Sequence, residues 1–306
     1  PVGNEPMFDI LNIRRDRVMM ESDFPKELQG AFNGMERNSN PWNMNEDRLN
    51  WAESDPGLEV KTVEQNPDFD ILFWVGCAGA FESRAQSIAR AFVKILNAAG
   101  VNFAVLGNKE KCTGDSARRA GNEYLFSMMA AENVEMLNSS GVKKIVVICP
   151  HCLHTLKNEY PQFGGNYEVI HHTEYINTLI REGNLTFSGP AEKEVTFHDP
   201  CFLGRHNLIF EYPRHSLTLA GVPVREMPRN RENSFCCGAG GGQMWKEEEK
   251  GREDVRKNRF KEAAQMNVST LATGCPFCMI MLSDAGRETE SQMQVSDIAE
   301  IVAARL

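Results

Sequence analysis

Short apolar runs alternate with amphipathic stretches along most of the chain. Residues 70–75 (DILFWV) form a nearly continuous apolar run, which is typical of a strand buried on both faces. Between residues 83 and 99 the apolar positions recur at helical spacing, and Gly100 follows as a helix stop. The pattern therefore predicts a strand followed by a helix over residues 70–99.

The same alternation continues towards the C-terminus. Further strands are predicted at residues 101–106, 144–148, 168–170, 194–197, 222–226 and 268–272. Helices are predicted at residues 117–137, directly after Cys152, at 173–180 and at 246–266. Asp115 and Thr173 are candidate caps for the first and third of these, and Ser296 for a final helix. Strands that alternate with helices indicate βαβ units and a parallel sheet.

Residues 1–67 do not follow this alternation. Residues 8–13 could form one or two amphipathic helical turns, and the rest is rich in Asn, Pro, Trp and acidic residues without a sustained period. We expect this segment to be an extended or helical lead-in that wraps the surface of the remaining chain. Trp42 and Trp51 are the candidate anchors.

The cysteines reveal an internal duplication. The first copy contains Cys77, then Cys112-Thr-Gly, then C-P-H-C with Cys149 and Cys152. The second contains Cys201, then Cys236-Cys237-Gly, then C-P-F-C with Cys275 and Cys278. The landmarks of the second copy follow those of the first by 124, 124 and 126 residues (201 against 77, 236 against 112, 275 against 149). These positions account for all nine cysteines.

The duplication predicts the domain organisation. We expect an α/β fold with two tandem pseudo-repeated domains, at residues 68–190 (CTG variant) and 191–306 (CCG), each a small, mostly parallel sheet flanked by helices. The cysteines follow the C-terminal ends of predicted strands, which is the edge where ligands bind in open α/β sheets. Cysteines that are distant in sequence should therefore converge in space.

Two repeated sets of thiols indicate a metal or cluster site. Buried apolar cysteines do not recur at matched spacing, and disulfides fit poorly because the count is odd. Thiolates select zinc, copper(I) or iron–sulfur clusters. Four thiolates suit zinc or a cluster, so both stay open for the first set, whereas the fifth thiolate of the second set favours an iron–sulfur cluster.

Residues near the second set could tune such a cluster. The glycines of GAGGG let backbone amides donate to sulfide or thiolate, so Gly238 and Gly240 are predicted to contact the cofactor, as is His198. The alternative, a dinucleotide-binding turn, needs a preceding strand and a GxGxxG pattern, and neither is clean here. His151 and Asp199 could also tune a cluster, and an ordinary loop role suits these two and His198 equally well. His171 and His172 are a candidate ligand pair, although a structural role suits them better. Catalytic residues stay unassigned, because no Ser–His–Asp set or carboxylate pair can be argued from the spacing.

Composition narrows the function classes. The 306 residues are 42% hydrophobic and 25% charged, as in ordinary globular proteins, and are enough for two domains. The net charge of −9 argues against a nucleic-acid partner, which would require a basic surface. No run of 18 apolar residues occurs, so no membrane span is expected in these residues.

The pattern Cys…Cys-Cys-Gly…Cys-x-x-Cys resembles the duplicated cysteine-rich (CCG) domain family. That family includes the catalytic subunit of heterodisulfide reductase and iron–sulfur subunits of glycolate, lactate and glycerol-3-phosphate oxidising enzymes. The phrases FHDPCFLGRHN, CCGAGGGQMW, KCTGDSARRAGNEYLF and CPHCLHTLKNEYPQFGG look closest to the iron–sulfur proteins associated with electron-transfer flavoprotein. The resemblance covers roughly residue 69 to the C-terminus. Thr113 departs from the family pattern, where a cysteine is usual.

The resemblance implies ligands and a function. It assigns a noncubane [4Fe–4S] cluster to the second domain, held by Cys201, Cys236, Cys237, Cys275 and Cys278. It assigns a four-thiolate site, [4Fe–4S] or zinc, to the first domain, held by Cys77, Cys112, Cys149 and Cys152. The implied function is an iron–sulfur oxidoreductase module that passes electrons from electron-transfer flavoprotein, or a similar flavoprotein, towards membrane quinone. The alternatives are a reductase of heterodisulfide or thiol substrates, an iron–sulfur subunit of a 2-hydroxy-acid oxidase, or a metal-stabilised docking module without catalysis.

The resemblance also implies a larger protein. In that branch a membrane haem-binding part and a ferredoxin-like part precede the repeats, and the first three residues resemble the end of a ferredoxin motif. We therefore expect a cytoplasmic piece that is membrane-associated, and reaches quinone, through a preceding part.

Overall fold

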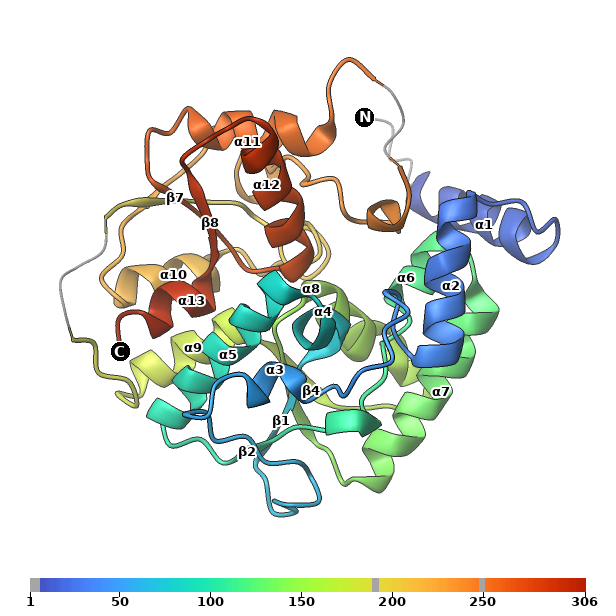
Figure 1. Cartoon of the computed structure of the whole chain (residues 1–306), viewed down its shortest axis with the longest axis horizontal. Helices are drawn as coiled ribbons and strands as arrows, with labels where there is room; N and C mark the ends of the chain where they lie inside the picture. Colours follow the sequence, from blue (N-terminus) through green and yellow to red (C-terminus); the bar gives the residue numbers. More distant parts are fainter. Residues whose placement is uncertain (1–5, 189–192, 248–250) are drawn as a thin grey trace.

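Two parallel four-stranded sheets form the centre of the protein (Figure 1). The computed structural model describes residues 6–188, 193–247 and 251–306. The first sheet has the order β2-β1-β3-β4 and the second β6-β5-β7-β8, with every pairing parallel. The strands are β1 (Ile71–Trp74), β2 (Phe103–Ala104), β3 (Lys144–Val147), β4 (Glu168–His171), β5 (Val195–Phe197), β6 (Val224–Arg225), β7 (Thr270–Thr273) and β8 (Gln294–Asp297). The predicted α/β class with two repeated parallel sheets is confirmed.

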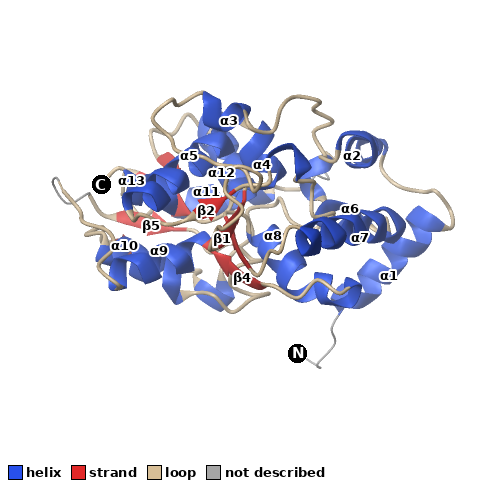
Figure 2. Cartoon of the chain, turned by 90° about the horizontal axis from the view of Figure 1, so that it is seen from below, coloured by secondary structure: helices blue, strands red, loops and turns tan. Residues whose placement is uncertain are grey.

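Helices cover the faces of both sheets (Figure 2). The first repeat contains α4 (Gly76–Phe81), α5 (Ser83–Ala98), α6 (Asp115–Ala120), α7 (Glu123–Ser139), α8 (Pro150–His154) and α9 (His172–Arg181). The second contains α10 (Glu211–Leu219), α11 (Val255–Ala264), α12 (Pro276–Glu288) and α13 (Ile298–Ala303). All four residues of β1 are buried, as expected of a strand covered on both sides.

The lead-in is more regular than the sequence suggested. It contains α1 (Pro6–Met19), α2 (Lys26–Asn38) and α3 (Asn50–Glu53). The buried residues of α2 recur at helical spacing (Leu28, Ala31, Phe32 and Met35), a short pattern that the polar composition obscures. Trp51 is 1% exposed and stands edge-on to Phe73 of β1, whereas the Trp42 ring lies parallel to that of Phe277 in α12. The two tryptophans therefore contact different repeats.

The helix predicted over residues 117–137 is two helices. Gly121 lies between α6 and α7 with φ of +100°, and a Cβ added there would stand 2.5 Å from the carbonyl oxygen of Arg14 in α1. Only glycine tolerates both the conformation and the close approach of α1. Asp115 is not the cap either, because it is the first residue of α6 and pairs with Arg119. Gly114 occupies the N-cap position.

Three other predicted boundaries were wrong. The helix after Cys152 already begins at Pro150, with Cys149 at its N-cap position, because proline suits the first turn. The helix predicted over residues 246–266 begins at Val255 in the described part of that segment, and residues 248–250 lie outside the described residues. Thr173 lies inside α9, where its hydroxyl hydrogen-bonds the His171 ring.

Asp297, and not Ser296, caps the final helix. Its carboxylate accepts from the Ala299 amide, and the Glu300 carboxylate accepts from the Asp297 amide, which completes a capping box. Ser296 belongs to β8, a strand that the apolar pattern did not reveal. The alternation of buried and half-buried positions in β8 is only four residues long.

The two repeats pack against each other crosswise. Helix α5 of the first contacts α13 of the second, and α10 of the second contacts α9 of the first. His172 Nε2 lies 2.8 Å from Asp297 Oδ1, and both side chains are fully buried. Arg84 of α5 donates to Glu300 at 2.7 Å and to the Val295 carbonyl oxygen at 2.9 Å. The ends of β4 and β8 are thereby fixed to one another.

We predict that Asp297→Ala lowers the free energy of unfolding by about 2–4 kcal/mol, because it removes a helix cap and leaves the buried His172 ring without its partner. Urea denaturation followed by circular dichroism measures the change.

The matched control is Ser296→Ala, one residue earlier in the same strand. It should change the free energy of unfolding by less than about 0.5 kcal/mol, because Ser296 provides no cap. An equal loss of unfolding free energy in the two variants would contradict the roles of Asp297 as the cap of α13 and as the partner of His172.

Candidate metal centres

The cysteines lie where parallel strands end. Cys77 stands in the first turn of α4 just after β1, and Cys149, Cys201 and Cys275 follow β3, β5 and β7. The carboxyl ends of parallel strands share one edge of a sheet, so thiols that are distant in sequence meet there. The remaining cysteines come from the loops that follow β2 and β6 and from the first turns of α8 and α12.

The four cysteines of the first copy share one buried site. The sulfurs of Cys77 and Cys112 are 3.8 Å apart, and Cys149 and Cys152 lie close enough to shift each other's pKa. A Cβ added at Gly76 would lie 3.5 Å from the Cys152 sulfur, which places the two pairs side by side. All four side chains are buried.

The five cysteines of the second copy form a continuous chain of contacts. Cys201 and Cys236 shift each other's pKa, and so do Cys236 and Cys237, Cys237 and Cys278, and Cys278 and Cys275, so each thiol of the set lies next to another. Cys237, Cys275 and Cys278 are buried, whereas Cys201 and Cys236 are partly exposed. This set is therefore open to solvent on one side.

The two sets touch each other. Cys149 of the first copy and Cys275 of the second, which are equivalent positions in the repeat, lie close enough for each thiol to shift the pKa of the other. The sequence predicted two separate sets and contained no sign of this contact. It arises because the repeats pack crosswise, which brings the ends of β3 and β7 together.

One glycine in each copy donates to a thiol. The amide of Gly114 lies 3.5 Å from the Cys112 sulfur, and that of Gly238 lies 3.2 Å from the Cys236 sulfur. Both glycines have positive φ, at +81° and +92°, which aims the amide back at the sulfur. Gly240 also lies beside the second set, since a Cβ added there would be 3.8 Å from the Cys201 sulfur. The predicted contact of Gly238 and Gly240 with a cofactor stays a prediction.

These donors decide which cysteine carries negative charge. Hydrogen bonds from Cys201 and Cys237, helped by the Gly238 amide, lower the pKa of Cys236 to about 2. The bond to Cys236 in turn raises the pKa of Cys237 to about 12. In the first copy the hydrogen bond from Cys77, with a smaller contribution from Gly114, likewise lowers the pKa of Cys112. The first cysteine of CTG and of CCG is thus favoured as a thiolate. In the first copy Cys149 is favoured as well: burial would raise its pKa, but its contacts with Cys152, Cys275 and His151 lower the pKa well below its ordinary value.

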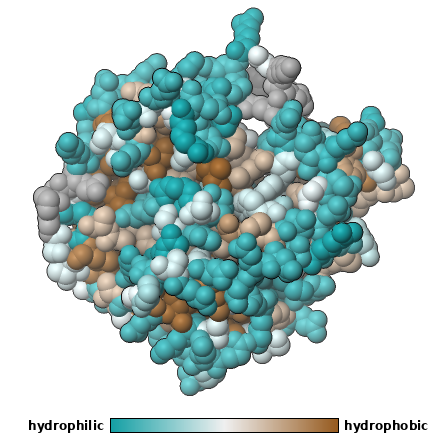
Figure 3. Space-filling view, in the orientation of Figure 1, coloured by the Kyte–Doolittle hydropathy of each residue, from teal (hydrophilic) through white to brown (hydrophobic). Residues whose placement is uncertain are grey.

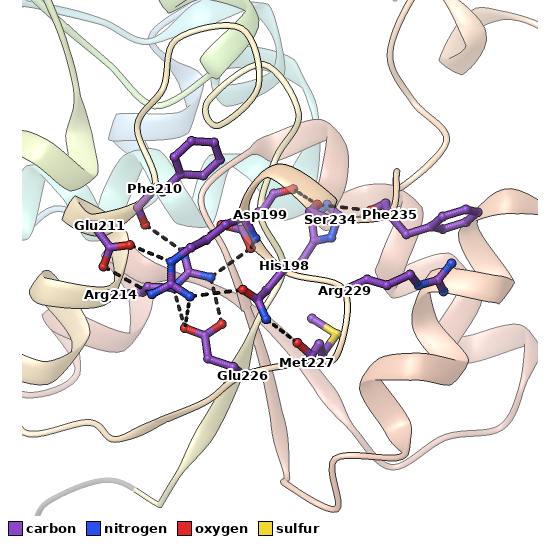
Figure 4. A network of polar contacts seen from close by, with 12 residues as sticks. His198, Asp199, Phe210, Glu211, Arg214, Glu226, Met227, Arg229, Ser234 and Phe235 are labelled. Carbon is purple, nitrogen blue, oxygen red and sulfur yellow. Dashed lines mark hydrogen bonds and ion pairs between the residues drawn. The ribbon is translucent and has the colours of Figure 1, made fainter. Parts of the chain in front are cut away.

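Asp199 organises the loop that carries the CCG motif (Figure 4). Its carboxylate pairs with both terminal nitrogens of Arg214 at 2.7 and 3.0 Å and accepts from the Arg231 amide at 2.9 Å. Its carbonyl oxygen accepts from the Ser234 hydroxyl at 3.0 Å. Arg214 also binds Glu226, so the network joins α10 to the start and end of this loop. The side chain acts on protein groups and not on the thiols.

His198 faces the second set from the end of β5. It is 1% exposed, and one of its ring nitrogens and the sulfurs of Cys237 and Cys278 lie within 4.8 Å of one another. Burial, followed by the charge of Arg259, lowers the pKa of His198 to about 3, so its ring is neutral. The predicted neighbourhood of His198 to the second set agrees with this placement, whereas its role towards a cofactor stays a prediction.

The other histidines divide between the first set and the repeat interface. His151 Nδ1 lies 3.7 Å from the Cys149 sulfur. Burial would lower the pKa of His151, but the hydrogen bond with Cys149 and the charge of Asp115 raise it above its ordinary value. His171 ends β4 and hydrogen-bonds Thr173 of the same repeat, whereas His172 begins α9 and hydrogen-bonds Asp297 across the repeat interface.

A cavity of about 720 Å³ opens onto the exposed side of the second set. Cys201 and Cys236 form part of its wall. Further wall residues include Met7, Phe8, Arg205 and His206. The α1 residues beside it are unusually exposed for apolar side chains, with Phe8 at 57%. Figure 3 shows apolar surface at the α1 corner as one of several apolar patches on that face.

The fold and its two thiol sets define a duplicated cysteine-rich domain, and the chain belongs to the family "CCG: Cysteine-rich domain", which matches residues 71–157 and 195–283. It is 43% identical over 311 residues to "Probable iron-sulfur-binding oxidoreductase FadF" of Bacillus subtilis, covering 99% of this chain and 44% of that protein. It is 44% identical over 313 residues to "EtfAB:quinone oxidoreductase" of Syntrophomonas wolfei, with the same coverage.

A third relative is archaeal. The chain is 35% identical over 298 residues to a subunit of the "Dihydromethanophenazine:CoB--CoM heterodisulfide reductase" of Methanosarcina barkeri, covering 94% of this chain and 68% of that protein. The chain spans less than half the length of the first two relatives. Among the described residues, no helix combines the length and apolar character needed to cross a bilayer.

We predict that iodoacetamide at pH 6 modifies Cys236 first in the reduced, metal-free protein. Alkylation requires a thiolate, and a depressed pKa keeps Cys236 ionised at a pH where an ordinary thiol is protonated. Its partial exposure gives the reagent access. Peptide mass spectrometry after short reaction times identifies the modified cysteine.

Cys237 is the internal control, since it is the adjacent residue but is 2% exposed and has a raised pKa. It should react far more slowly than Cys236. Equal labelling of Cys236 and Cys237 would contradict the difference in exposure and pKa between these two cysteines.

Proposed function

We propose that this chain is the iron–sulfur electron-transfer part of an oxidoreductase, which takes electrons from a flavoprotein and passes them towards membrane quinone. One observation carries the proposal: nine cysteines form two adjoining sets in contact through Cys149 and Cys275. A relative named for flavoprotein and quinone chemistry aligns with almost the whole chain. Quinone would be reached through a part of the protein outside these residues.

The donor sets fit iron–sulfur clusters. Cys201, Cys236, Cys237, Cys275 and Cys278 would hold a noncubane [4Fe–4S] cluster. Cys77, Cys112, Cys149 and Cys152 would hold a [4Fe–4S] cluster or zinc. Bound clusters would supply one-electron redox chemistry. Five thiols exceed the four ligands of structural zinc, which favours iron for the second set.

The exposure of the cysteines suggests where electrons would enter the protein. Cys201 and Cys236 are the two partly exposed thiols, so the second set is where an external partner can come close. The other seven cysteines are buried, and the contact of Cys149 with Cys275 lies between the sets. Burial keeps water from the inner thiols, and the amides of Gly114 and Gly238 offset negative charge on the thiolates.

A second function, reduction of a disulfide or thiol substrate, is favoured by the cavity beside Cys201 and Cys236. Its volume of about 720 Å³ is large enough for a small organic molecule. The relative from Methanosarcina barkeri is named as part of a heterodisulfide reductase and aligns with both repeats. In this alternative the exposed thiol side of the second set would be the substrate side.

Anaerobic mixing with photoreduced electron-transfer flavoprotein tests the first function against the second. We expect bleaching of the visible iron–sulfur absorption in the intact chain and a large loss of that response in Cys201→Ser, which opens the partly exposed set. Bleaching by dithionite but not by the flavoprotein, together with turnover of a disulfide, would favour the alternative.

The fifth cysteine can be tested against the other repeat. Cys237→Thr converts CCG into the CTG of the first copy, so the second site should keep about four of about eight irons per chain but change its paramagnetic spectrum and potential. Iron analysis and electron paramagnetic resonance measure the two effects.

The control is Thr113→Ser, which alters the equivalent residue of the first copy but adds no thiol. It should leave iron content and spectra unchanged. An unaltered spectrum in Cys237→Thr would reduce Cys237 to a packing residue, and complete iron loss would show that the two sites are not interchangeable.

A further inference from the structure

We propose that Arg259 holds His198 in the tautomer whose proton is on Nε2, so that His198 donates an N–H hydrogen bond to the five-cysteine site and cannot bind iron. The inference rests on the iron–sulfur role proposed for that site. It concerns a positioning residue, Arg259, that sequence reasoning did not find.

The contact between the two side chains fixes the direction of the hydrogen bond. Arg259 Nε lies 3.0 Å from His198 Nδ1, and both side chains are buried. A guanidinium only donates, so Nδ1 must accept and can carry no proton. A neutral imidazole has one N–H, which is therefore on Nε2.

Arg259 is itself held in place. Its Nη1 donates to the Arg229 carbonyl oxygen and to a Glu262 carboxylate oxygen, each at 2.9 Å. Glu262 also accepts from the Arg229 amide and side chain. The guanidinium therefore cannot turn away from His198 without breaking a buried ion pair, so the tautomer is built into the fold.

The N–H on Nε2 is unpaired, in a ring that lies beside the thiols. Nε2 of His198 meets no hydrogen-bond partner among the residues that the structure describes. Cys237 and Cys278, both buried, lie next to the ring. A buried donor left unpaired is destabilising, so a thiolate or sulfide acceptor at this position would relieve that cost. Hydrogen bonds to cluster sulfurs raise the reduction potential.

The arrangement is the reverse of a metal-binding histidine. A histidine that binds metal through one nitrogen usually donates its other N–H to a carboxylate or carbonyl oxygen. Here the other nitrogen faces a cation that donates to it. Nε2 thus has no lone pair to offer iron, although His198 lies close enough to Cys237 and Cys278 for a ligand set.

The first repeat supports the same conclusion. Trp74 is the equivalent of His198, at the offset of 124 residues that relates Cys77 to Cys201. It is fully buried at the end of β1, and its ring N–H also meets no partner in the described residues. An indole nitrogen donates and never accepts. Trp74 and His198 therefore both present an unpaired ring N–H at this position of the repeat. Arg259 gives His198 this property, because it holds the proton on Nε2.

The test uses protein labelled with ¹⁵N in histidine. Long-range proton–nitrogen correlation spectra of the metal-free chain should show His198 with its proton on Nε2, assigned by the signal lost in His198→Gln. In the loaded, reduced protein, pulsed paramagnetic resonance should show only a weak coupling to His198 nitrogen. A proton on Nδ1, or the strong coupling of an iron-bound nitrogen, would overturn the proposal.

Two variants measure the effect on the cluster. His198→Met removes the N–H and should shift the potential of the second site to a more negative value at unchanged iron content. His198→Gln, which keeps an N–H donor, should shift it less, and His206→Gln on the cavity wall should not shift it. Equal potentials in all three would also overturn the proposal. A chain that binds no iron would refute the proposed function instead, while the tautomer measurement on metal-free protein would still decide this inference.

Discussion

The buried hydrogen bond between His172 and Asp297 ties the end of β4 to the end of β8, and the geometry of the thiols depends on that tie. Each sheet alone would gather only the cysteines of its own repeat. Because α5 packs on α13 and α9 on α10, the carboxyl edges of the two sheets face each other and Cys149 meets Cys275. The nine thiols of the two repeats then form one connected group.

Within that group, neighbouring cysteines differ in pKa because of their hydrogen bonds. The neighbouring thiols are the main cause of the lowered pKa of Cys112 and Cys236, and the amide of a glycine with positive φ contributes in the same direction. Cys237 adds a further thiol beside Cys236, whereas Thr113 adds none beside Cys112. The two sets therefore differ in ligand number and in the surroundings of their most acidic thiols.

Features encoded by local sequence could be predicted, and features encoded by contacts between distant segments could not. The apolar runs at β1 and β3 and the cysteine spacing indicated the parallel sheets and the strand-end position of the thiols. The break at Gly121 depends on the approach of Arg14, and the cap at Asp297 depends on a strand with little apolar signal. The partner of His198 is 61 residues away on a charged helix, so no local pattern points to it.

The crosswise contact of α5 with α13 and of α10 with α9 is isologous: each half presents the same surface to the other, as the subunits of a twofold dimer do. A dimer of identical subunits must place the same residue at both equivalent positions. Fusion of the halves into one polypeptide removes that requirement. One ancestral site could then acquire Trp74 and Thr113 while the other acquired His198, Arg259 and Cys237, so that a symmetric scaffold came to hold two chemically distinct centres.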